Sequence, residues 1–93
     1  MASFANKPID VVIDVRSRLE FWLGHIEGAV CIPVWKVATA VPQRTEIAKD
    51  ARILVYCASG GRSAAAAEVL RKLGYDRVTD GGAFTEARAR FTP

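Results

Sequence analysis

The spacing of hydrophobic residues predicts a chain in which strands and helices alternate. Short apolar runs rich in β-branched residues predict buried strands over residues 9–15, 28–33, 52–56 and 77–79. Apolar residues at helical spacing predict helices over residues 17–24, 34–41, 63–73 and 83–91. Such alternation is typical of an α/β domain with a mainly parallel sheet and right-handed crossovers.

Polar residues and glycines mark where the helices begin and end. Ser17 and Glu20 have the spacing of a capping box, and Gly24 and Gly74 are suited to end the first and third helices. In the second helix, Trp35 and Ala38 are expected to face inward. Pro42 is expected to end this helix. Trp22 and Trp35 are both expected in the core or at the rim of a pocket, and Gly81 and Gly82 are expected to form a turn.

Length and composition indicate one small globular domain spanning residues 1–93, in which residues 1–8 could be disordered. The chain is 51% hydrophobic and 25% charged and contains no low-complexity tract. No apolar run approaches the ~18 residues of a membrane span, so no membrane contact is expected. The first residues lack the pattern of a signal peptide, which favours the cytoplasm, with the periplasm as the alternative for a mature form.

The net charge of +3 is spread along the chain rather than gathered in a basic cluster. A nucleic-acid interface normally concentrates Lys and Arg on one face, so we expect no nucleic-acid partner. A small anionic substrate is compatible with a mildly basic protein.

The chain has two cysteines, Cys31 and Cys57, and a single histidine, His25. These are too few for a structural zinc site or a disulfide scaffold, so no metal is expected. Cys31 lies in an apolar run and is expected to be a core residue, with a resolving thiol as the alternative. His25 is expected to make a structural hydrogen bond.

Cys57 follows the most apolar predicted strand and precedes a strong helix. Ligands of parallel α/β sheets bind beyond the carboxyl ends of the strands. Gly60 and Gly61 allow successive backbone N–H groups to converge there, and the helix N-terminus adds its partial positive charge. The arrangement would favour the Cys57 thiolate and bind an anion. The alternative is a buried cysteine in a tight turn.

The residues from Ile13 onward resemble the rhodanese family, and within it the phage-shock protein E type. The resemblance rests on residues 14–16, 20–21 and 24–29, the loop 57–63, and residues 73–75 and 80–83. It implies a three-layer α/β/α rhodanese-like fold with a small, mainly parallel sheet of four or five strands. The family usually has an additional strand before Asp14, which must be short or absent here.

The resemblance also implies a thiosulfate sulfurtransferase that needs no cofactor. Cys57 would attack the outer sulfur of thiosulfate, release sulfite and pass the sulfur of its persulfide to a thiol or to cyanide. A sulfur-relay protein is a further candidate partner. The substrate would be held by the remaining residues of the loop, which are Ala58, Ser59, Gly60, Gly61, Arg62 and Ser63.

Three polar residues are expected to support the loop. Asp14, Arg16 and Glu20 would form ion pairs that brace it, with Arg62 as the partner of Asp14 or Glu20. Arg62 would then act through position rather than through direct contact with the anion.

Two other functions remain as alternatives. One is a cysteine phosphatase or arsenate reductase. Tyrosine-phosphatase loops place five residues between cysteine and arginine, whereas only four separate Cys57 from Arg62. A smaller ring of N–H groups suits a single sulfur better than a tetrahedral oxyanion. The domain could also be an interaction or sulfur-carrier module without thiosulfate turnover, although such modules are expected to lack the cysteine.

Overall fold

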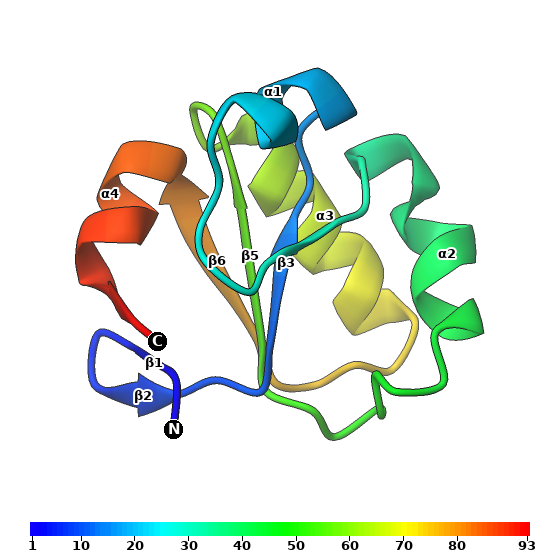
Figure 1. Cartoon of the computed structure of the whole chain (residues 1–93). Helices are drawn as coiled ribbons and strands as arrows, with labels where there is room; N and C mark the ends of the chain where they lie inside the picture. The colour runs from blue at the N-terminus through cyan, green and yellow to red at the C-terminus, as the bar shows by residue number, and fades with distance from the viewer.

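A four-stranded parallel sheet forms the centre of the computed structural model, which describes all of residues 1–93 (Figure 1). Its strands, in spatial order, are β4 (Val30–Cys31), β3 (Val11–Asp14), β5 (Ile53–Cys57) and β6 (Val78–Ala83). All three neighbouring pairs are parallel. The expected α/β class and mainly parallel sheet are therefore confirmed.

Helices cover both faces of this sheet, because the strands at its centre are apolar on both sides. Residues Ile13, Val55 and Cys57 pack on one face against α2 (Val37–Gln43) and α3 (Gly61–Lys72). Leu54 and Tyr56 point to the opposite face, where they meet α4 (Phe84–Arg90). The layers are thus helix, sheet and helix, and no helix is long and apolar enough to cross a membrane.

The N-terminal segment, for which disorder was one expectation, forms a short hairpin in the structure. Strand β1 (Ser3–Phe4) pairs antiparallel with β2 (Lys7–Pro8) and, on its other side, with β7 (Phe91–Thr92). Phe4 is buried beneath this small sheet. The additional strand that the family usually has before Asp14 is therefore not part of the central sheet. In its place, the N-terminal hairpin pairs with the C-terminal strand β7 in a separate small sheet.

The helices after β3 and β4 differ from the prediction in the direction of their apolar residues. Helix α1 (Arg18–Leu23) buries no side chain, and the indoles of Trp22 and Trp35 are both exposed, so neither is a core residue. A 3₁₀ turn, η1 (Val34–Lys36), precedes α2 and rotates it, so that Val37 and Val41 face the core instead of Trp35 and Ala38. Pro42 lies inside the last turn of α2 instead of ending it.

Strand β6 continues through the two glycines that were expected to form a turn. A Cβ atom at Gly81 would lie 2.9 Å from the Leu54 side chain and 3.1 Å from the carbonyl oxygen of Val55. The close approach of β6 to β5 therefore requires glycine at this position. The register shift between Val55 and Cys57 shows that the ladder is irregular here, immediately before the cysteine.

Candidate active site

Cys57 is the last residue of β5 and lies at the carboxyl edge of the sheet, directly before α3. Its side chain is fully buried. The chain turns through Gly60, whose φ of 107° is a left-handed conformation that side chains other than glycine rarely adopt. This turn lets α3 begin at Gly61, so that the N-terminus of a 12-residue helix points toward the sulfur.

Hydrogen-bond donors surround the Cys57 sulfur. The backbone N–H of Gly60 donates to Sγ over 2.9 Å, and the Ser63 hydroxyl lies 3.5 Å from it. Burial raises the pKa of the Cys57 thiol, but hydrogen bonds from the Ser63 hydroxyl and from the backbone N–H groups of Ser63, Gly60 and Ser59 outweigh it. The net result is a lowered pKa, as an activated thiolate requires.

The Ser63 hydroxyl has one proton and two acceptors within reach. It donates to the carbonyl oxygen of Gly60 over 3.0 Å, while the Cys57 thiol donates to Ser63 Oγ. When Cys57 loses its proton, the hydroxyl can rotate and donate to the thiolate instead. Ser63 therefore favours the charged form of the sulfur directly.

The other loop side chains are turned away from the sulfur. Ala58 and Ser59 are exposed, so that only their backbone faces the turn. The guanidinium of Arg62 points to α1, where it forms two hydrogen bonds with the Glu20 carboxylate, of 2.7 and 3.0 Å. The structure thus selects Glu20, rather than Asp14, as the partner of Arg62.

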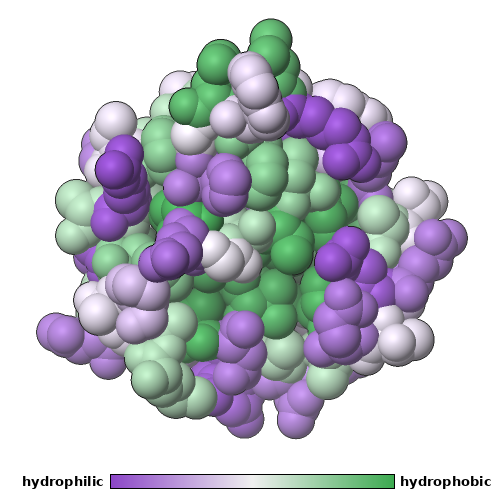
Figure 2. Space-filling view, in the orientation of Figure 1, coloured by the Kyte–Doolittle hydropathy of each residue, from purple (hydrophilic) through white to green (hydrophobic).

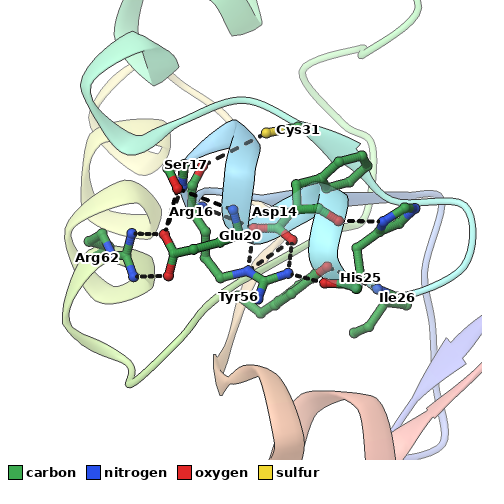
Figure 3. A network of polar contacts seen from close by, with 11 residues as sticks. Asp14, Arg16, Ser17, Glu20, His25, Ile26, Cys31, Tyr56 and Arg62 are labelled. Carbon is green, nitrogen blue, oxygen red and sulfur yellow. Dashed lines mark hydrogen bonds and ion pairs between the residues drawn. The ribbon is translucent and has the colours of Figure 1, made fainter.

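Glu20 connects the start of α1 with the start of α3 (Figure 3). Besides Arg62, its carboxylate accepts from both the backbone N–H and the hydroxyl of Ser17, each over 3.0 Å. The expected capping box is therefore present, and the same carboxylate ties the start of α1 to the start of α3. The hydrogen bond from Arg62, supported by those from Ser17, lowers the pKa of Glu20 to about 2.

Asp14 and Arg16 form a separate, buried ion pair beside the Glu20–Arg62 pair (Figure 3). The Arg16 guanidinium donates to both Asp14 oxygens over 2.7–3.1 Å, and the two side chains are 0% and 7% exposed. Its terminal nitrogen also donates to the carbonyl oxygen of Gly24 over 2.6 Å, and the guanidinium lies 4.4 Å from the centre of the Phe84 ring. The pair thus joins β3 to the end of α1 and to α4.

Tyr56 is a supporting residue that the sequence analysis did not identify. Its hydroxyl accepts a hydrogen bond of 3.0 Å from the backbone N–H of Ile26, which anchors the segment after α1 to β5. Burial raises the pKa of this hydroxyl, and its hydrogen bond with Asp14 acts in the same direction. The sequence does contain a signal for this role. Alternation along the strand places the residue before Cys57 on the opposite face of the sheet, and the hydroxyl of a tyrosine buried there needs a polar partner.

His25 and Cys31 lie outside the immediate surroundings of the sulfur. The Nδ1 atom of His25 is 2.8 Å from the carbonyl oxygen of Phe21, and the His25 ring stacks on the Phe21 ring, which matches the expected structural role. Cys31 is half-buried on the edge strand β4, where it is paired in register with Asp14 of β3. Asp14 is in turn in register with Tyr56 of β5, so Cys31 lies two strands from β5. Roughly 10 Å of sheet separates its backbone from β5, too far for a disulfide with Cys57.

The largest surface hollow of the chain lies elsewhere. It has a volume of about 450 Å³ and is lined by residues from the start of β3, from the segment before β4 and from the loop after α2. Cys57 is not among its lining residues, so the candidate site is a turn of backbone donors and not a deep pocket.

The hydrogen-bond donors to the Cys57 sulfur are mainly backbone N–H groups. The lowered pKa of Cys57 should therefore not depend on a histidine. In a Cys31→Ser background, the pH midpoint of iodoacetamide alkylation should lie below the ~8.5 of a free cysteine. Ser63→Ala should raise this midpoint, since one of the donors is lost. His25→Ala and Ser59→Ala should leave it near the starting value, because these side chains do not reach the sulfur. A midpoint of 8.5 or more in the parent protein would contradict an activated Cys57.

The Glu20 brace should make stability depend on pH in the acid range. Its carboxylate has a depressed pKa in the folded state, so its stabilising effect is complete above the ordinary value of 4.5 and is lost as the pH falls toward about 2. Glu20→Gln should therefore lower the urea midpoint at pH 7, and the difference from the parent should shrink by pH 3. Glu68→Gln is the control, since its pair with Lys72 is well exposed and should matter little.

Comparison with known proteins supports the resemblance to the rhodanese family that the sequence motifs indicated. A family model described as a rhodanese-like domain matches residues 2–84. Thiosulfate sulfurtransferase PspE of Escherichia coli K12 is 38% identical over 74 residues, which cover 75% of this chain and 66% of PspE. The tRNA uridine(34) hydroxylase of Cronobacter sakazakii is 34% identical over 88 residues, which cover 89% of this chain but only 25% of the hydroxylase.

A solved structure described as a rhodanese with anions from E. coli has a TM-score of 0.78 at 28% identity. The match covers 88% of this chain and 95% of that one. The expected resemblance, including that to the phage-shock type, is thus confirmed, although the chain spans slightly under two thirds of PspE and a quarter of the hydroxylase. Together, the layered fold, the cysteine turn and these matches show that the chain belongs to the rhodanese-like domain family.

Proposed function

We propose that the protein transfers sulfane sulfur from thiosulfate or a persulfide donor to a thiol or cyanide acceptor through a persulfide on Cys57. The observation that carries the proposal is the ring of donors on the Cys57 sulfur, to which Gly60 and Ser63 contribute at the start of α3. These groups stabilise negative charge at a fixed point, which both halves of the reaction need. The name of PspE, a thiosulfate sulfurtransferase, supports the choice of donor.

In the first half of the reaction, the Cys57 thiolate attacks the outer sulfur of thiosulfate. A new S–S bond forms at Cys57, the S–S bond of thiosulfate breaks, and sulfite leaves with the electron pair. In the second half, the acceptor attacks the outer sulfur of the persulfide, and Cys57 departs as a thiolate. The donors at Gly60 and Ser63 hold the charge that returns to the sulfur.

The remaining loop residues have indirect roles in this proposal. The backbone of residues 58–63 cradles the persulfide, while Arg62 is held away from the sulfur by Glu20. Arg62 therefore fixes the start of α3 and adds a nearby positive charge, without bonding the substrate. Asp14 and Arg16 stabilise the neighbouring part of this edge of the sheet, because their ion pair joins the end of β3 to the end of α1.

Residues 1–93 act as one rhodanese domain in this proposal. The last helix and strand lie beyond the matched residues 2–84, yet Ala87 is fully buried against the sheet and Phe91 is level with Phe4 in the small terminal sheet. Removing this helix and strand would expose the buried residues on the face of the sheet that α4 covers.

The test is to add thiosulfate to the reduced protein and to weigh the protein by mass spectrometry. A gain of about 32 Da, located on the Cys57 peptide and removed by cyanide, is the expected result. A mass unchanged by both thiosulfate and polysulfide would reject the proposal. Hydrolysis of aryl phosphates faster than consumption of thiosulfate would favour the phosphatase alternative instead.

A carrier module without thiosulfate turnover is the second candidate. The match with the hydroxylase, which covers a quarter of that longer protein, supports this alternative, because a domain within a larger chain can carry sulfur or dock a partner for the rest of that chain. Such a module would take up sulfur from a persulfide donor but would not turn over thiosulfate and cyanide.

A further inference from the structure

The exposed large hydrophobic side chains are concentrated at the edge of the sheet that carries Cys57. Apart from Met1, they are Leu19, Trp22, Leu23 and Trp35, which are 66–79% exposed. We name these four residues the apolar collar. Three belong to α1, which follows β3, and the fourth belongs to η1, which follows β4, so all lie beyond the carboxyl ends of the strands. Figure 2 shows apolar side chains protruding at the top, where Figure 1 places α1.

Helix α1 is held in place mainly by polar contacts, and Phe21 is its one apolar residue that packs against the core. It buries no side chain. Its N-terminus is fixed by the capping box and by the Arg62–Glu20 pair, and its C-terminus by the bond from Arg16 to the Gly24 carbonyl oxygen. Of the apolar residues of α1, only Phe21 packs against the core, while Leu19, Trp22 and Leu23 are exposed. Exposed apolar groups gathered beside a reactive site are typical of an interaction surface.

Two cations flank the apolar collar. Arg18 on α1 and Lys36 on η1 are both exposed. Arg18 is the first residue of α1 and Lys36 is the last residue of η1, so both belong to the two elements that carry the apolar collar. Neither forms an ion pair within the chain, so both are free to meet an acidic group.

Acidic side chains do not cancel this charge. Glu20 is already paired with Arg62. Asp80 and Glu86 belong to β6 and α4, at the other end of the edge from η1, because the strand order is β4-β3-β5-β6. The collar side of the site is thus apolar and positively charged.

We propose that the apolar collar docks an acidic and apolar segment of a protein that presents a cysteine thiol to the Cys57 persulfide. This inference rests on the proposed function and names its acceptor. The buried sulfur admits only a slender nucleophile, such as a cysteine side chain, and the collar supplies the contact area that a thiol alone lacks. The acceptor thiolate forms a bond to the outer sulfur, the bond from that sulfur to Cys57 breaks, and Cys57 leaves as a thiolate while the acceptor becomes a persulfide.

Two other occupants fit the charges and the recessed sulfur less well. A second copy of this chain, docked collar to collar, would place Arg18 and Lys36 against the same cations. A lipid surface would cover the turn at Cys57 and hinder an anionic sulfur donor from reaching it.

Binding can be measured without catalysis, because Trp22 and Trp35 are the only tryptophans of the chain. The probe is a synthetic peptide that contains leucine, phenylalanine, several glutamates and a serine in place of the cysteine. Its matched partner carries lysine at each glutamate position. At low salt the glutamate peptide should shift the tryptophan emission to shorter wavelength and bind about tenfold more tightly than the lysine peptide.

Charge reversal tests the surface itself. The double variant Arg18→Glu, Lys36→Glu should reverse the preference between the two peptides, whereas Lys72→Glu, at the far end of α3, should leave it unchanged. Equal binding of both peptides by the parent protein would overturn the proposal. Binding to phosphatidylglycerol vesicles in place of either peptide would overturn it in favour of a membrane, and self-association without peptide binding in favour of a dimer.

Sulfur transfer separates this inference from the function on which it rests. With cysteine-containing versions of the peptides, the persulfide protein should transfer sulfur about tenfold faster to the glutamate peptide. Trp22→Ser with Trp35→Ser should slow transfer to the glutamate peptide without changing transfer to cyanide. No transfer to cyanide by the parent protein would contradict the proposed function, whereas normal transfer to cyanide with no preference between peptides would contradict only the docking surface.

Discussion

Replacing Cys57 with alanine is expected to abolish sulfur transfer while the protein remains folded. The side chain is the only nucleophile within reach of the Gly60 and Ser63 donors, so no second group can take its place. The loss of a sulfur atom from a buried position should cost stability only modestly, since the alanine methyl still packs against the core. Thiosulfate–cyanide turnover and the urea midpoint are the two measurements.

Cys31→Ser is the matched control for this variant. Cys31 lies on the edge strand, with its sulfur 3.8 Å from the carbonyl oxygen of Arg16 and two strands from β5. We expect its replacement to leave turnover close to that of the parent protein. If Cys31→Ser lost turnover with an unchanged urea midpoint, the roles assigned to the two cysteines would be wrong.

Replacing Arg16 with leucine should give the largest loss of stability. Asp14 would keep its charge in a fully buried position without its partner, and breaking a buried pair on one side typically costs about 3–5 kcal/mol. The carbonyl oxygen of Gly24 would also lose its donor. Urea denaturation at pH 7 measures the effect, and turnover of the folded fraction shows whether the pair has a catalytic role as well.

The chain contains a natural control for this comparison. Arg52 and Asp10 form a similar two-bond pair, of 2.7 and 2.9 Å, but both side chains are about one-third exposed. Arg52→Leu should therefore lower the urea midpoint far less than Arg16→Leu does. The double variant Asp14→Leu, Arg16→Leu should recover part of the loss, because it leaves no unpaired charge. Similar losses for Arg16→Leu and Arg52→Leu would show that burial does not set the strength of the pair.

The two ion pairs around α1 have different consequences for the site. The Asp14–Arg16 pair is buried and links β3 to the end of α1 and to α4. The Glu20–Arg62 pair is partly exposed and determines where the start of α3 lies relative to α1. The same contacts hold the turn that follows Cys57 and present the apolar collar, so a partner docked on α1 would lie against the residues that support Cys57.

Local sequence alone determined the parts of this protein that depend on neighbouring residues. The buried strand over Ile53–Cys57, the capping box of Ser17 and Glu20, and the cysteine at a helix N-terminus were all predictable, because each needs only a short pattern. Gly60 was recognisable for the same reason, since a turn between strand and helix requires backbone freedom. These features located the candidate site.

Tertiary structure decided which apolar residues are buried and which polar groups meet. Helical spacing predicted that Trp22 and Trp35 face inward, but α1 is positioned by Arg62 and Arg16, and the 3₁₀ turn rotates α2, so both indoles are exposed. The choice of Glu20 for Arg62 depends on the spacing of β3 and β5 in the sheet. A short window cannot predict such contacts, because they join residues more than forty positions apart that only the folded sheet brings together.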